Sequence, residues 1–149
     1  MANEAKPPLH LWIIGVLATL WGAIGSYDYV MTRMRNTDYL AAMMPGVDPQ
    51  AVLAWIDGFP IWAQIGWGLG VWGGVAGAIL LLARSRWAVP VLAVSLIGAI
   101  VSLGYQLLAA PPLAGADGAM FDVMPLVIIA IAAALVIYAR AMRAKGVLR

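Results

Sequence analysis

The sequence predicts an all-α integral membrane protein: a bundle of four transmembrane helices with an interfacial helical segment between the first two. Of the 149 residues, 64% are hydrophobic and only 11% are charged, and the mean hydropathy is +0.91. Four apolar runs each approach the roughly 20 residues that cross a bilayer. A soluble domain of this length could not bury so much apolar surface, so lipid must be its solvent. We expect residues 1–149 to form a single membrane domain.

The first span is predicted at residues 9–30, directly after Pro7-Pro8. Its apolar run is longer than the 7–15 residues of a signal-peptide core, so we expect it to remain uncleaved. Small residues recur along it at helical spacing, namely Gly15, Ala18, Gly22 and Ser26. Such a smooth stripe lets another helix approach closely, and we expect it to face the small-residue stripe of the second span.

Residues 31–59 are more polar and predict an outer surface segment at the lipid headgroups. Residues 37–44 either extend the first helix or follow it, until Pro45-Gly46 stops them. Asp48-Pro49 predicts a helix start, with Asp as the N-cap. Gly58 predicts the end of this helix. The apolar side chains of this piece share one face: Val52, Trp55 and Ile56. It either lies flat on the membrane or is a coil linker, because two helical turns are marginal alone.

The second span, predicted at residues 61–83, carries a stripe of glycines. They are Gly66, Gly70, Gly73, Gly74 and Gly77, and they form three overlapping GxxxG patterns. Glycines at this spacing predict close helix packing. The stripe serves either as a seam within the bundle or as a contact between copies of the chain.

The third and fourth spans are predicted at residues 87–109 and 123–139. The third has Pro90 in its first turn, where proline costs little, and a small-residue face. A Pro/Gly-rich loop separates the two spans. The fourth span is rich in Ile, Val and Ala and has no glycine, so we expect it to be the most exposed to lipid.

The basic residues predict the orientation. Seven of the nine Lys and Arg residues lie together if both termini are cytoplasmic: Lys6, Arg84, Arg86, Arg140, Arg143, Lys145 and Arg149. Only Arg33 and Arg35 then lie outside. This asymmetry follows the positive-inside rule and predicts a multi-pass protein of the bacterial cytoplasmic membrane. It also explains the basic pI of about 9.2 without nucleic acid as a partner.

Several kinds of chemistry are not expected. The chain has no Cys and one His, so neither thiolate nor His-based metal sites are expected. No nucleotide-binding or catalytic motif occurs, so we expect no cofactor, no catalytic residues and no enzymatic activity. The central third of each span is uncharged, which argues against a proton relay or a carrier with a midplane carboxylate.

One polar group of residues remains at the outer ends of the spans. Its members are Tyr27, Asp28, Tyr29, Arg35, Gln64, Tyr105 and Gln106. Amides, phenols and a carboxylate are suited to a neutral polyol or another polar solute. Asp28 and Arg35 would share a face if the first helix continued. The alternative is interfacial anchoring, because Tyr gathers at membrane surfaces regardless of function.

Five segments carry a resemblance: SYDY at residues 26–29, RMRN at 33–36, FPIW at 59–62, VWGG at 71–74 and WAVPV at 87–91. They resemble a family of small bacterial four-span membrane proteins, some of them labelled sugar transporters. The resemblance covers most of the chain up to the third span. It implies a four-span fold and sugar-like transport, and it supplies no established binding residues.

Two functions follow as expectations. The first is transport of a small, sugar-like solute by an oligomer, because four short helices leave little room for a pathway. The second is a non-catalytic accessory or assembly subunit of a larger membrane complex, with the glycine stripes as contact surfaces. The expected partners are the lipid bilayer and either further copies of the chain or that complex.

Overall fold

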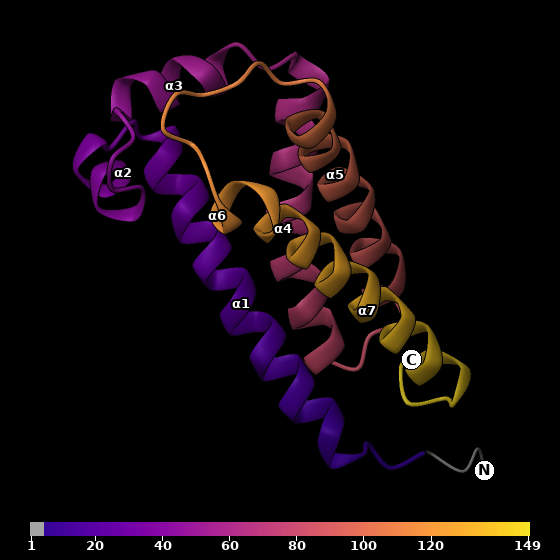
Figure 1. The fold of residues 1–149 in the computed structure, drawn as a ribbon. Coiled ribbons are helices and arrows are strands. Elements are labelled where there is room, and N and C mark those ends of the chain that lie inside the picture. Colours follow the sequence, from indigo (N-terminus) through magenta and orange to yellow (C-terminus); the bar gives the residue numbers. More distant parts are fainter. Residues whose placement is uncertain (1–4) are drawn as a thin grey trace.

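The computed structural model describes residues 5–149. Every regular secondary-structure element in this range is an α-helix (Figure 1). The helices are α1 (Leu9–Arg33), α2 (Thr37–Met43), α3 (Pro49–Asp57), α4 (Ile61–Leu82), α5 (Ala88–Leu108), α6 (Ala119–Asp122) and α7 (Met124–Ala144). Four stretches are long and apolar enough to cross a membrane: α1, α4, α5 and α6–α7. The predicted fold class is therefore confirmed, and the protein is a multi-pass helical membrane protein.

The four long helices pack in the order α1, α4, α5, α7. The α4–α5 pair shares the largest interface, α1 packs on α4, and α7 packs on α5. The predicted spans agree with these helices within a few residues, although α7 continues past Ala139 and carries Arg140 and Arg143 on its last turns. In the fourth span only 6% of the most apolar window is buried, against 33% in α5, so the prediction that this span is the most lipid-exposed is confirmed.

Glycines bring the backbones of α4 and α5 together. A Cβ atom on Gly98 would lie 2.5 Å from the carbonyl oxygen of Gly66 and 2.7 Å from the amide nitrogen of Gly70. The hydroxyl of Ser95 donates a 2.6 Å hydrogen bond to the carbonyl oxygen of Gly70. The glycine stripe of α4 therefore packs within the chain, against the small-residue face of α5.

The stripe on α1 also faces α4, but it meets large side chains there. A Cβ atom on Gly15 would lie 2.5 Å from Leu82, and one on Gly22 would lie 2.8 Å from Val75. The expectation that the α1 and α4 stripes face each other is therefore wrong. The physical reason is that α5 already covers the glycine face of α4, so α1 packs on a different face.

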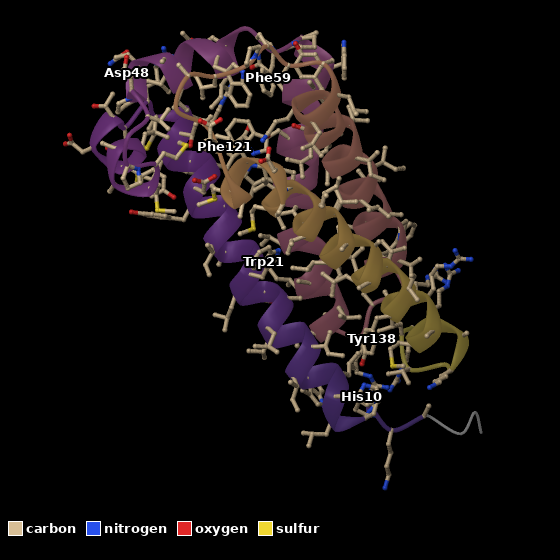
Figure 2. The ribbon with its side chains drawn as sticks, viewed as in Figure 1. His10, Trp21, Asp48, Phe59, Phe121 and Tyr138 are labelled. Carbon is tan, nitrogen blue, oxygen red and sulfur yellow. The ribbon has the colours of Figure 1, made fainter. Side chains whose placement is uncertain are left out.

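One end of the bundle, which we call the terminal end, is closed by a core and by both ends of the described chain. Its largest fully buried side chains are Leu11 and Leu81. Arg84 donates hydrogen bonds to the carbonyl oxygens of Ala5 and Val147, each 3.2 Å long. At the same end His10 of α1 is hydrogen-bonded to the Tyr138 hydroxyl of α7 (Figure 2).

At the opposite end, α2 and α3 form a cap that lies across the bundle (Figure 1). Asp48 is the N-cap of α3, as predicted, and its carboxylate accepts a 3.1 Å hydrogen bond from the Gln50 amide. The alternative of a coil linker is wrong. Val52 is only 2% exposed and packs with Leu40, so this part of the apolar face of α3 contacts protein rather than lipid.

Candidate functional site

A cavity of about 260 Å³ lies beneath the cap, and we call it the cap cavity. Side chains from α1, α3, α4, α5 and α7 line it, including Asp28, Trp55, Gln64, Trp67, Ser102, Gln106 and Met124. Phe59, in the turn between α3 and α4, also contributes to the wall, and Figure 2 shows this residue at the cap end of the bundle. All four long helices therefore position residues around one space.

Asp28 is the acidic group of the cap cavity. It is half-buried, and its Oδ1 atom accepts a 2.9 Å hydrogen bond from the Tyr39 hydroxyl. Burial raises the pKa of Tyr39 to about 12, and the hydrogen bond to Asp28 and its charge add to this effect. Tyr39 therefore stays protonated at neutral pH and serves as the donor. A carboxylate has acceptor capacity beyond one hydrogen bond, so Asp28 can also accept from a ligand.

Gln64 stands at the border between the cap cavity and a neighbouring pocket. Its Nε2 atom donates to the carbonyl oxygen of Phe59 at 2.9 Å. Its Oε1 atom accepts a 3.2 Å hydrogen bond from Arg33. These two bonds fix the orientation of the amide.

Aromatic rings form a large part of the cavity wall. Trp55 meets Phe59 edge to face, with ring centroids 4.7 Å apart, and the Trp55 indole donates a 2.7 Å hydrogen bond to the carbonyl oxygen of Pro111. Trp67 comes from α4 on the same face as Gln64. The wall therefore presents apolar ring surfaces beside the amides and the carboxylate.

Six of the seven predicted site residues divide into two groups. Asp28, Gln64 and Gln106 come together around the cap cavity. The three tyrosines, in contrast, do not line it. Tyr27 packs against Tyr39, Tyr29 against Trp67 and Trp72, and Tyr105 against Phe59 and Trp62.

Sequence reasoning missed Tyr39, Trp55, Phe59, Trp67 and Ser102 as part of this site. A signal for two of them was present in the helical spacing. Trp67 follows Gln64 by three residues and Ser102 precedes Gln106 by four, and residues at these spacings share a helix face. The other three come from the cap and its turn, and no local pattern shows which part of the bundle the cap covers.

Arg35 does not line the cap cavity with Asp28, and the helix face that the two would share if the first helix continued does not form. The reason is that α1 ends at Arg33 and Arg35 adopts a left-handed conformation with φ 57°. Arg35 instead lines a second pocket of about 230 Å³, which we call the arginine pocket, together with Thr32, Arg33, Asp57 and Gln64. Leu53 and Ile56 complete its lining.

The backbone conformation of Arg35 is costly. A non-glycine residue in this region costs of order 1–3 kcal/mol. Arg35 forms an ion pair with Asp57 at 3.0 Å, but the two side chains are 54% and 53% exposed. An exposed ion pair contributes only about 0.2–1 kcal/mol, because solvent screens it. The ion pair therefore does not offset the backbone strain.

No known protein family, curated protein or solved structure matches this chain. Within residues 5–149 no group of three or more acidic, His or Cys side chains is arranged to hold a metal ion. Fold and cavity together define the class: a multi-pass membrane protein whose helices surround a mixed polar and aromatic cavity near one membrane face.

Proposed function

We propose that the protein is a transport unit for a small, neutral, polar solute of sugar-like chemistry. The observation that carries the proposal is the cap cavity, where a carboxylate, two amides and a hydroxyl stand beside aromatic rings. Hydroxyl groups of a polyol both donate and accept, and these side chains supply partners for both roles. Ring surfaces suit the apolar C–H faces of a sugar. The volume of about 260 Å³ is below the roughly 300–1,000 Å³ of sites for drug-sized ligands and fits a small solute.

We further propose that the protein works in the bacterial cytoplasmic membrane as an oligomer, with both termini cytoplasmic. Seven of the nine basic residues support this orientation. The cap cavity then faces the outer side. The buried core at the terminal end supports an oligomer, because it leaves little room for a pathway through one chain.

The alternative function is that of an accessory subunit that contacts a larger complex through its glycine stripes. This alternative loses support because α5 covers the α4 stripe, and Leu82 and Val75 cover Gly15 and Gly22 of the α1 stripe. These glycines are therefore unavailable to a foreign helix. Transport by copies of the same chain is the better supported function.

The test is a binding and uptake experiment. Trp55 and Trp67 line the cavity, so a bound solute should change the tryptophan fluorescence of purified protein. We expect a saturable change with at least one sugar or polyol from a panel, and uptake of that solute by proteoliposomes. Gln106→Ala should weaken both, whereas Gln50→Ala on the exposed surface of α3 should leave both unchanged.

Two outcomes would contradict the proposal. One is the absence of any fluorescence change and any uptake across the panel. The other is an equal response in the Gln106→Ala variant, which would place the binding elsewhere. Native mass spectrometry after purification in mild detergent tests the alternative, because a stoichiometric foreign partner would favour an accessory subunit.

A further inference from the structure

We propose that the arginine pocket binds a phosphate group. This pocket lies beside the cap cavity and shares Gln64 and Ile56 with it. Its charged side chains come from the end of α1, the turn after it and α3. The inference does not depend on the proposed transport function. The phosphate site can exist whether or not the cap cavity binds a sugar.

The distribution of charge is the first argument. Arg33 and Arg35 are the only Lys or Arg residues between Lys6 and Arg84, and both line this one pocket. Their hydrogen bonds to Gln64 and Asp57 use the Nη1 atoms. The guanidinium Nε and Nη2 groups are further donors, and their planar arrangement matches phosphate oxygens. The hydroxyl of Thr32, a residue that is 6% exposed, adds another donor in the lining.

The backbone at Arg35 is the second argument. Within the described chain two non-glycine residues have positive φ, Arg35 and Arg84, and each follows the end of a long helix. This position normally favours glycine. Arg84 has a structural use for its side chain, because it bonds the carbonyl oxygens of Ala5 and Val147. The left-handed turn at Arg35 closes the end of α1, because the Arg35 amide donates to the carbonyl oxygen of Thr32 at 3.0 Å and the Asn36 amide to that of Met31 at 3.1 Å. Glycine would serve this turn at lower cost, and the arginine side chain makes only the exposed ion pair with Asp57, so its guanidinium can bind a ligand.

Asp57 is the internal counter-ion of Arg35. Both of its carboxylate oxygens accept from Nη1 of Arg35, at 3.2 and 3.0 Å. A phosphate that enters the pocket competes with this carboxylate for Arg35. The Asp57 side chain is 53% exposed, so it can turn away into solvent at little cost.

Two sources can supply the same phosphate chemistry: the headgroup of an anionic phospholipid and a soluble phosphate ester. In both, Arg33 and Arg35 would neutralise the charge and donate hydrogen bonds to the oxygens. The experiment therefore has two arms. The first measures thermal unfolding of the full-length protein in a neutral detergent, with sodium phosphate against sodium chloride at equal ionic strength. The second counts phosphatidylglycerol molecules retained by the protein in native mass spectrometry.

Two variants that both break the Arg35–Asp57 ion pair distinguish loss of a ligand-binding group from loss of the ion pair itself. Arg35→Gly removes the guanidinium and suits the left-handed backbone, so the variant should keep the wild-type melting temperature without phosphate. It should weaken phosphate binding by roughly tenfold or more, or lose one retained phosphatidylglycerol. Asp57→Asn removes the competing carboxylate and should tighten phosphate binding by roughly twofold to tenfold. Arg143→Gln, an exposed site at the terminal end, should leave both measurements unchanged.

A rise in melting temperature with inorganic phosphate identifies a soluble ligand, and retained phosphatidylglycerol identifies a lipid headgroup. The proposal is overturned if neither arm responds in the wild-type protein. It is also overturned if Arg35→Gly and Asp57→Asn change binding in the same direction, because the ion pair alone would then account for the effect.

Discussion

The hydroxyl of Tyr39 donates a 2.9 Å hydrogen bond to the carboxylate of Asp28, and this bond joins the cap to the first membrane span. The two residues are brought together because the chain leaves α1 at Arg33 and α2 then folds back beside its last turns. Asp28 thus holds the cap on one side and lines the cap cavity on the other. One carboxylate therefore both contacts the cap and lines the cap cavity.

The first prediction separates these two roles of Asp28. Asp28→Asn keeps an oxygen that accepts from Tyr39, so thermal stability should change little. The amide cannot accept a charge-assisted hydrogen bond, so solute binding should fall. Tyr39→Phe should change solute binding little. It should lower the free energy of unfolding by about 1–2 kcal/mol, because it leaves the carboxylate without its donor. Thermal unfolding and solute titration of both purified variants check this. The prediction is refuted if the two variants lose the same amount of stability and the same amount of binding.

The second prediction concerns alkaline pH. The pKa of Tyr39 is raised to about 12 by burial and by Asp28, above the value of 10.0 for the free side chain. A group whose pKa is raised on folding stabilises the protein fully below its unfolded pKa and loses that contribution as pH rises through the folded pKa. The stability advantage of wild type over Tyr39→Phe should therefore shrink between pH 10 and pH 12. Unfolding measured in parallel for the two proteins cancels the titration of other groups, and a constant difference would contradict the prediction.

The third prediction tests the α4–α5 seam with two glycines of the same helix. A methyl group on Gly98 would press on the backbone of Gly66 and Gly70, whereas nothing lies within 4 Å of one on Gly104. Gly98→Ala should cost about 1–3 kcal/mol of unfolding free energy, as overpacking does. Gly104→Ala should be neutral or stabilise by up to about 1 kcal/mol, since alanine is the better helix former. Melting temperatures in detergent provide the comparison, and equal values for the two variants would mean that the seam is not close-packed.

The fourth prediction concerns orientation, and the absence of natural cysteine makes it simple to test. Asp117 and Lys145 are both exposed and lie in the α5–α7 connection and just after α7. With cytoplasmic termini, Asp117→Cys should react with an impermeant thiol reagent in intact cells. Lys145→Cys should react only after the membrane is opened. The reverse labelling pattern would invert the orientation and move the cap cavity to the cytoplasmic side.

Much of the fold could be predicted because hydropathy and helix caps are local. The spans follow from apolar length, and α3 follows from the Asp48 N-cap with Pro49 after it. Helix partners could not be predicted in the same way. The α1 stripe indicates where a neighbour approaches, but nothing in its spacing shows that Val75 and Leu82 meet it instead of the glycines.

The site could be predicted only in part, for a geometric reason. Asp28, Gln64 and Gln106 were found because polar side chains at span ends are conspicuous. Tyr27 and Tyr29 neighbour Asp28 in sequence, but consecutive residues on a helix point in different directions, so they pack against other rings. Arg35 was predicted for this site but lines the arginine pocket instead, because a left-handed backbone at a helix end is not expected of arginine.

The unequal ends of the bundle have a mechanical consequence for a transporter. At the cap end, a few exposed polar bonds and two short helices separate the cavity from solvent. At the terminal end, any passage must separate Leu11 from the buried apolar core and break the backbone hydrogen bonds that join Arg149 to Arg84 and Arg86. For the proposed transport function, entry of the solute from the cap side is therefore the step with the lower barrier, and release through the terminal end is the step that should limit the rate.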